Sequence, residues 1–348
     1  MSNGLAFKPS QLRELLIRAV PARLPVLVKG APGIGKTDIV TQVAKFLKAN
    51  LMVMHPVVSD PTDFKGMPWV IVEKFEDGEK HKAVFLPFHE LEELIYAKVL
   101  TICFPDDLGQ APPAVQSAFM QLFLARSING HKISDFVSFV GATNRKADKA
   151  GVSGVLEPVK SRFASIVELQ PDVDDWVEWA LKNGMPTELV AFIRYRPNLL
   201  WDFKPTTDLT NTPSPRTVCN VGKLMGINLP KDIEYGTYSG AAGEGFAAEF
   251  MGFLKIYRTL VTPDAILLNP ESAEVPTDPA ALYATVIGLA SKTTETTVER
   301  VVKYSYRLPA EFSVLLIRDA LRGTKKKDEL LQTRPMIEWM TRNKEIML

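Results

Sequence analysis

The sequence has few of the residues that indicate a disulfide-bonded or zinc-binding protein. Only two of its 348 residues are cysteines, Cys103 and Cys219, and they are far apart. Two widely separated cysteines fit neither a disulfide framework nor a zinc pattern, and free cysteine is commonly a small buried residue. The four histidines show no metal-ligand spacing either. We therefore expect both thiols to pack in a core.

The sequence also lacks an excess of either charge and any long apolar run. Its formal net charge is +1, which gives no overall basic surface for nucleic acid or an anionic membrane. No apolar run reaches the ~18 residues of a membrane span, and MSNGLAFKPS does not resemble a signal peptide. We expect a cytoplasmic protein with neither membrane nor nucleic acid as partner. The basic run GTKKKDE is then a solvated loop.

Short apolar strands alternate with amphipathic helices in the first half of the chain. The predicted helices cover residues 10–20, 36–48, 89–97 and 113–125. The predicted buried strands are PVLVKG (25–30), LMVMHPV (51–57), VLTICF (99–104), FVSFVGATN (136–144) and SIVEL (165–169). This alternation predicts an α/β fold in which a parallel five-stranded sheet lies between helices.

Two further features divide the chain. Two β-prone arms flank Asp77-Gly78, which predicts a hairpin at about residues 68–88. From about Asp172 onward only helical patterns follow, with a polar break at 267–279. We expect an α/β domain over 1–171, a helical domain over 172–261 and a helical extension over 262–348.

A phosphate-binding pattern follows the first strand. It has the form G-x-x-x-x-G-K-[ST] and consists of Gly30, Ala31, Pro32, Gly33, Ile34, Gly35, Lys36 and Thr37. Glycines let backbone N–H groups surround phosphate oxygens, and the following helix directs its positive end at the anion. Lys36 is expected to reach the β- and γ-phosphates, and Thr37 to bind Mg²⁺. The pattern predicts a nucleoside triphosphate, ATP, rather than a simple glycine-rich turn.

Polar residues end two later strands. Asp106 and Asp107 follow VLTICF, and Asn144 ends FVSFV. Ligands bind at the carboxyl ends of parallel strands, and a phosphate-loop enzyme needs a carboxylate near its magnesium. We expect these side chains to hold magnesium, water or the γ-phosphate. The alternatives are a helix-capping Asp pair and an ordinary turn residue.

Taken in order, these motifs resemble the AAA+ ATPases of the MoxR type. GAPGIGKT resembles the Walker A motif, FPDDLGQ the Walker B motif, and FVGATNR the sensor-1 strand. LEPVKSRF resembles the arginine-finger segment, PSPRTV the sensor-2 start of a lid helix, and DPTDFKGMP with its hairpin the insert of this clade. The resemblance covers about residues 8–260, and implies that the helical domain is a lid.

The resemblance implies a role for each matching residue. Asp106 would be the magnesium-binding Walker B aspartate, and Asp107 the carboxylate that polarises water. Asn144 would be sensor 1, Arg162 the finger that reaches a neighbouring subunit's γ-phosphate, and Arg216 sensor 2. Either arginine could instead be an ordinary solvated charge.

Two departures from the family pattern affect these expectations. Walker B usually reads Asp-Glu, whereas here Asp107 is one methylene shorter. A water displaced by ~1 Å can cost roughly 10²-fold in rate, so we expect slow hydrolysis unless backbone adjustment recovers part of the loss. Pro105 cannot donate a backbone hydrogen bond, so regular strand pairing on that side should stop by residue 104.

A finger supplied in trans implies an assembly, and we expect a homo-oligomeric ring, a hexamer. The family resemblance implies a protein client that is remodelled or matured, and a partner with a von Willebrand factor A domain. Met67 or Trp69 would contact the client, unless Trp69 anchors the hairpin to the core. The competing hypotheses are an ATP-gated scaffold with very slow hydrolysis, a nucleic-acid motor and a small-molecule kinase.

Overall fold

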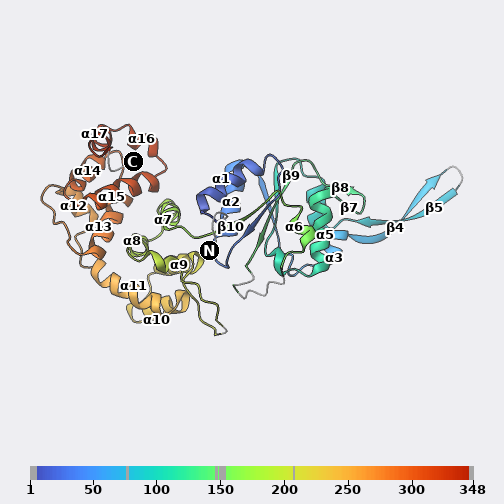
Figure 1. Ribbon diagram of the computed structural model, residues 1–348, viewed down its shortest axis with the longest axis horizontal. Coiled ribbons are helices and arrows are strands. Elements are labelled where there is room, and N and C mark those ends of the chain that lie inside the picture. The colour runs from blue at the N-terminus through green and yellow to red at the C-terminus, as the bar shows by residue number, and fades with distance from the viewer. Residues whose placement is uncertain (1–5, 76–77, 146–147, 149–153, 207, 345–348) are drawn as a thin grey trace. The chain divides into compact units, whose positions relative to one another are not determined.

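The computed structural model describes residues 6–75, 78–145, 148, 154–206 and 208–344. The chain forms two compact units, Met1–Gln170 and Pro171–Leu348, and each is described by itself (Figure 1). The first unit contains all the strands found among the described residues.

The first unit is built on a six-stranded parallel sheet, which confirms the predicted α/β fold. Five of its strands correspond to the predicted segments. The sixth, a two-residue edge strand, pairs with Glu168 and Leu169 and is too short to show a sequence period. The strand order is β1 (Ala6–Phe7), β10 (Ser165–Leu169), β2 (Val26–Lys29), β9 (Val137–Thr143), β6 (Thr101–Pro105) and β3 (Asn50–Met54).

Helices cover both faces of this sheet. Figure 1 shows α1 (Pro9–Ala19) and α2 (Lys36–Leu47) on one side and α5 (Pro113–Ala125) and α6 (Glu157–Lys160) on the other. On the α5 side, the Phe123 ring lies 5.0 Å from those of both Phe139 and Phe163. Such aromatic contacts add to the hydrophobic stabilisation that fixes α5 on the sheet.

Pro105, the last residue of strand β6, limits its pairing on one side only. Its pairing with β9 runs only to Cys103, whereas its pairing with β3 continues to Pro105. Asp106 N–H donates to the Met54 carbonyl, 2.9 Å away. Because N–H groups alternate between the two sides of a strand, the missing Pro105 donor falls on the β9 side. Pairing there stops before residue 104, as predicted.

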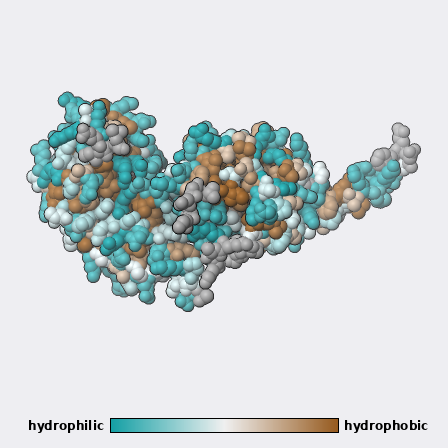
Figure 2. All heavy atoms as spheres, in the orientation of Figure 1, coloured by the Kyte–Doolittle hydropathy of each residue, from teal (hydrophilic) through white to brown (hydrophobic). Residues whose placement is uncertain are grey.

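The hairpin consists of β4 (Met67–Phe75) and β5 (Gly78–Leu86), which pair antiparallel; Asp77 of the predicted turn lies outside the described residues. It points away from the sheet in Figure 1. Trp69 is 54% exposed and Met67 52%. The hypothesis that Trp69 anchors the hairpin in the core is therefore wrong, and Figure 2 shows apolar surface at the hairpin base.

Shorter elements complete the first unit around the base of this hairpin. They are α3 (Pro61–Lys65), α4 (His89–Ile95), β7 (Ser127–Ile128) and β8 (His131–Lys132). The His131 ring nitrogen Nε2 lies 2.7 Å from the Phe85 carbonyl oxygen, and Asn129 Nδ2 donates to the Lys65 carbonyl at 2.6 Å. These contacts attach the hairpin base to the β7–β8 turn.

The described part of the second unit has helices and no strand, as the sequence predicted. None of the helices in the described ranges is long and apolar enough to cross a bilayer. The helices are α7 (Val173–Lys182), α8 (Thr187–Tyr195), α9 (Pro215–Met225), α10 (Lys231–Ala242), α11 (Glu244–Tyr257), α12 (Pro263–Leu268), α13 (Pro279–Ser291), α14 (Val298–Ser305), α15 (Ala310–Gly323), α16 (Lys327–Leu331) and α17 (Arg334–Arg342).

Two hydrophobic clusters stabilise the second unit, and α13 packs against both. Ile287 of α13 joins a cluster rich in phenylalanine, whereas Leu289 joins one that contains Trp339. Cys219 packs half-buried against the first cluster, while Cys103 is fully buried in the first unit. The predicted boundary near residue 261 remains a prediction, since α13 connects the helices on both sides of it.

A buried ion cluster joins α7, α8 and α15. Arg194 is 8% exposed and donates from Nη2 to Asp319 Oδ1 at 2.6 Å and from Nε to Oδ2 at 3.0 Å. It also pairs with Asp174. Burial raises the pKa of Asp319 even though Arg194 and Arg318 oppose this. Removing one partner of such a cluster leaves an uncompensated buried charge.

We predict that Arg194→Met destabilises the second unit by about 3–5 kcal/mol, because Asp319 then loses its two hydrogen bonds from Arg194 and keeps only Arg318, 3.5 Å away, as a counter-ion. The measurement is urea unfolding followed by tryptophan fluorescence in a Trp69→Phe background, in which the four remaining tryptophans lie in this unit. The control is Arg334→Met, which removes an exposed ion pair with Glu338 and should cost less than about 1 kcal/mol. Equal effects of the two substitutions would contradict the assigned role of Arg194.

Candidate functional site

The phosphate loop joins β2 to α2 at the carboxyl end of the sheet. Gly33 has φ 75° and Gly35 φ 102°, conformations that favour glycine. A Cβ on Gly30 would lie 3.3 Å from Ile34 Cγ2 and 3.4 Å from the Leu169 carbonyl oxygen. The loop is therefore a backbone-lined cradle at the positive end of a 12-residue helix, which suits an anion.

Lys36 is the first residue of α2, and its ammonium group lies inside the cradle. Its Nζ donates to the carbonyls of Gly30 at 3.0 Å and Ala31 at 3.2 Å, and to Asn144 Oδ1 at 2.6 Å. The residue is only 7% exposed. A desolvated ammonium beside backbone N–H groups is suited to a phosphate, whose oxygens can replace these neutral acceptors.

Thr37 and Asp106 lie together, although 69 residues separate them. Thr37 Oγ1 donates to Asp106 Oδ2 at 2.7 Å, and Asp106 Oδ1 accepts from the Asp107 N–H at 3.0 Å. A hydroxyl and a carboxylate are the oxygen ligands that Mg²⁺ prefers alongside water and phosphate. These two residues therefore fit a magnesium site, where the ion would neutralise phosphate charge.

Asn144 connects the cradle with the Asp pair. Its Oδ1 accepts from Lys36, while its Nδ2 donates to Asp107 Oδ1 at 2.7 Å. Asn144 is 7% exposed, so both contacts are shielded from solvent. Side chains that follow β2, β6 and β9 thus form one hydrogen-bonded network, as the strand-end argument predicted.

Asp107 has an unusual backbone. Its φ of 55° and ψ of 33° are left-handed, a conformation in which aspartate is one of the more tolerant non-glycine residues. This geometry turns the chain directly after β6, so that Asp106 and Asp107 both face the site. Aspartate at this position is compatible with this turn.

The sequence analysis missed a second charged network beside the site. Lys29 at the end of β2 bonds to Glu168 on the neighbouring β10 at 2.8 Å. Arg145, next to Asn144, reaches Glu168 at 3.3 Å and Asp148 at 2.8 Å. The hydrogen bond from Lys29 is the main cause of the lowered pKa of Glu168. The sequence does show charged residues at the ends of the apolar strands. Which of them pair, however, depends on which strands are neighbours in the sheet, and the sequence does not give that order.

Arg162 lies at the opposite end of the sheet from the loop. It precedes β10, and Ala164 N–H donates to the Pro25 carbonyl at the start of β2. The four residues of β2 span ~13 Å, which exceeds the length of an arginine side chain. Arg162 Nη1 donates to Ser161 Oγ, and its buried Nε has no hydrogen-bond partner among the described residues.

Arg216 belongs to the second unit. It is an exposed residue in the first turn of α9, a helix capped by Ser214, which accepts from Thr217 N–H. Arg216 and the phosphate loop lie in different compact units, so the sensor-2 role of Arg216 remains a prediction. The same holds for the individual catalytic roles assigned to the other residues of the site.

The sequence of this region matches a known protein family. Residues 25–163 match the family model described as AAA domain (dynein-related subfamily). This segment is therefore similar to an AAA domain. It contains the cradle, the Asp pair, Asn144 and Arg162, so the AAA part of the resemblance is confirmed.

Solved structures similar to the whole chain share little sequence with it. One example is the Thermotoga maritima RuvB Holliday junction branch migration motor, with 16% identity over 93% of this chain and 85% of that one and a TM-score of 0.35. Another is Brucella abortus NtrX in complex with ADP, with 13% identity over 97% of this chain and 68% of that one and a TM-score of 0.41. A putative ATPase from Cytophaga hutchinsonii has 15% identity, coverages of 96% and 88% and a TM-score of 0.33. No curated protein gives a significant match.

We predict that Lys36→Met weakens ATP binding by the AAA domain at least about 100-fold, because the variant keeps the side-chain length but loses charge-assisted hydrogen bonds. Titration with a fluorescent ATP analogue measures the affinity. The control is Lys45→Met in the last turn of the same helix, where the lysine is exposed. An unchanged affinity in Lys36→Met would mean that the cradle is not the nucleotide site.

Proposed function

We propose that the protein is a MoxR-type AAA+ ATPase that assembles into a ring, a hexamer, and hydrolyses ATP at its subunit interfaces. The energy would remodel or mature a protein client, together with a partner that carries a von Willebrand factor A domain. The observation that carries this proposal is the network in which Asn144 joins Lys36 to Asp107. This network connects phosphate binding to the carboxylate that would orient water.

Each site residue has a role in this proposal. Lys36 and the loop backbone would bind the β- and γ-phosphates, and Thr37 with Asp106 would hold Mg²⁺. Asp107 would orient the attacking water, and Asn144 would position both Asp107 and the γ-phosphate. Arg216 would contact the subunit's own nucleotide from the lid.

The location of Arg162 supports hydrolysis between subunits. In its own chain, Arg162 lies at the amino-terminal end of the strands, whereas the loop lies at their carboxyl end. It therefore cannot stabilise its own γ-phosphate, and a catalytic role requires a neighbouring copy. An arginine finger supplied in this way can contribute roughly 10³–10⁵ in rate.

The exposed hairpin supports a protein client. Met67, Trp69 and Val70 are each more than half exposed at its base. Exposed aromatic and methionine side chains are typical of protein contact surfaces. In a ring, such a hairpin would present these residues to a client.

We predict that Arg162→Ala lowers steady-state ATP hydrolysis about 10³-fold or more while ATP affinity stays within about threefold. The control is Lys160→Ala, which removes a nearby half-buried cation that pairs only with Glu157 in the described structure. Specific activity of the native protein should rise with protein concentration. Activity independent of concentration, retained in Arg162→Ala, would favour a small-molecule kinase.

A mixing experiment sharpens this test. Lys36→Met subunits should fail to bind ATP but still supply Arg162. Arg162→Ala subunits should bind ATP but lack the guanidinium group for their neighbour. Random 1:1 mixing in a head-to-tail ring should restore about a quarter of the native interfaces. No recovery beyond the sum of the two separate variants would contradict hydrolysis in trans.

A second candidate function is an ATP-gated scaffold that binds ATP but hydrolyses it very slowly. The observation that favours it is Asp107, which is one methylene shorter than glutamate and is already bonded to Asn144. A water held ~1 Å from its best position can react roughly 10²-fold more slowly. Binding, rather than turnover, would then switch the conformation.

We predict that Asp107→Ala lowers hydrolysis about 100-fold or more, while Asp107→Glu changes it less than about tenfold. The control is Asp135→Ala, which removes an exposed carboxylate that precedes β9, at the amino-terminal end of that strand. The rate is measured as phosphate release at saturating ATP. An increase of about 100-fold in Asp107→Glu would favour the scaffold, and no loss in Asp107→Ala would refute the role of Asp107.

A further inference from the structure

The second unit contains a cavity of about 550 Å³ that the nucleotide chemistry does not use. Its walls come from helices α8 to α13 and from the segments before α10 and before α12. This volume lies within the range of small-molecule sites, which are mostly apolar with a few convergent polar groups.

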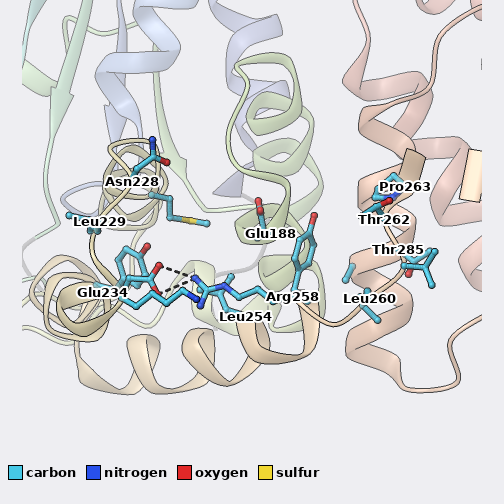
Figure 3. Close-up of a pocket in the computed structure, with 16 residues that line it drawn as sticks. Glu188, Asn228, Leu229, Glu234, Leu254, Arg258, Leu260, Thr262, Pro263 and Thr285 are labelled. Carbon is cyan, nitrogen blue, oxygen red and sulfur yellow. Dashed lines mark hydrogen bonds and ion pairs between the residues drawn. The ribbon is translucent and has the colours of Figure 1, made fainter. Parts of the chain in front are cut away.

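One wall of the cavity is fixed by an ion pair. Arg258 Nη2 donates to both carboxylate oxygens of Glu234, at 2.9 and 3.1 Å, and Figure 3 shows the two side chains pointing toward each other. Glu234 is only 7% exposed, so its charge is neutralised mainly by this arginine. The Arg258 guanidinium is thereby engaged and is a poor receptor for an added anion.

Glu188 of α8 is different, because its carboxylate has no cationic partner in the part of the chain that the structure describes. Among the described residues, no lysine, arginine or histidine lies within ion-pair distance of it, and it accepts a long hydrogen bond of 3.4 Å from the Thr187 hydroxyl. In the view of Figure 3, Glu188 lies between the Glu234–Arg258 pair and the residues Leu260, Thr262, Pro263 and Thr285. It is half-buried.

Two tyrosines of the cavity lie within the field of Glu188. Burial is the main cause of the raised pKa of both tyrosines, and the negative charge of Glu188 adds to it at both, at Tyr238 as a smaller contribution than that of Glu234. Tyr257 contacts the Thr187 hydroxyl at 3.1 Å through its own hydroxyl. Aromatic faces and a carboxylate are the groups that recognise organic cations.

We propose that this cavity binds a small organic cation, an alkyl amine or guanidinium compound. Glu188 accepts hydrogen bonds from the cationic head, and Tyr238 and Tyr257 surround it. The alkyl part packs against Leu254, Leu260 and Pro263, which line the same cavity. The remaining lining cation, Lys231, is exposed and does not neutralise Glu188.

The experiment is isothermal titration calorimetry of the full chain at 150 mM salt with agmatine and putrescine. Succinate and 1,4-butanediol serve as the anionic and neutral probes of similar length. The variant is Glu188→Gln, which keeps the side-chain shape but loses the charge. The matched control is Glu299→Gln on α14, where the glutamate is exposed and pairs with Lys303.

We expect saturable one-to-one binding of at least one cation, weakened about tenfold or more in Glu188→Gln and less than twofold in Glu299→Gln. The bound cation should also raise the thermal midpoint of the native chain and the control more than that of Glu188→Gln. This second readout confirms that the variant is folded.

Three results would overturn the proposal. The first is no saturable binding of either cation up to 10 mM, since ~10 mM is already weak for a built site. The second is equal affinity in the native chain and Glu188→Gln. The third is tighter binding of succinate than of either cation, which would assign the cavity to anions through Arg258 and Lys231. None of these results bears on the nucleotide site.

Discussion

The Lys36 ammonium group is the interaction on which the candidate site depends. It joins the loop carbonyls of Gly30 and Ala31 to Asn144, and through Asn144 to Asp107. A phosphate oxygen that takes a donor from Lys36 must displace one of these acceptors, because an ammonium has three N–H groups. Displacement of Asn144 would free its side chain to reorient. Occupancy of the cradle is therefore coupled, through one amide, to the carboxylate that would hold water.

Asp107 combines two requirements that conflict in part. The left-handed backbone at this residue turns the chain so that both aspartates face the site, and aspartate tolerates that conformation well. In the proposed mechanism, however, this side chain would have to reach the attacking water although it is one methylene shorter than glutamate. The structure meets the first requirement, and Asn144 restrains the carboxylate at 2.7 Å. In the proposed enzyme, the rate of hydrolysis would then depend on how closely the site can bring water to Asp107.

The parts of the structure that the sequence predicted are those governed by local pattern and parallel topology. The loop, the Asp pair and Asn144 could be placed together because parallel strands end at one edge of a sheet. The two-residue strand β1 shows no period, and the Lys29–Glu168 pair requires knowledge that β10 lies beside β2. The buried ion pair of Arg194 could not be predicted for a related reason. A charge on an amphipathic helix is ordinarily solvated, and its partner Asp319 is 125 residues away in the sequence.

The opposite positions of the cradle and Arg162 on one sheet constrain how the proposed enzyme would work. The groups that bind nucleotide belong to a single chain, so binding needs no partner. The guanidinium that would stabilise transition-state charge must come from another copy, because β2 separates it from its own loop by ~13 Å. The affinity for nucleotide would then be set by one chain, and the rate of hydrolysis by the arginine of the neighbouring chain across the same subunit contact. Substitutions that disturb only this contact should consequently lower turnover without loosening the nucleotide, whereas those in the cradle should do both.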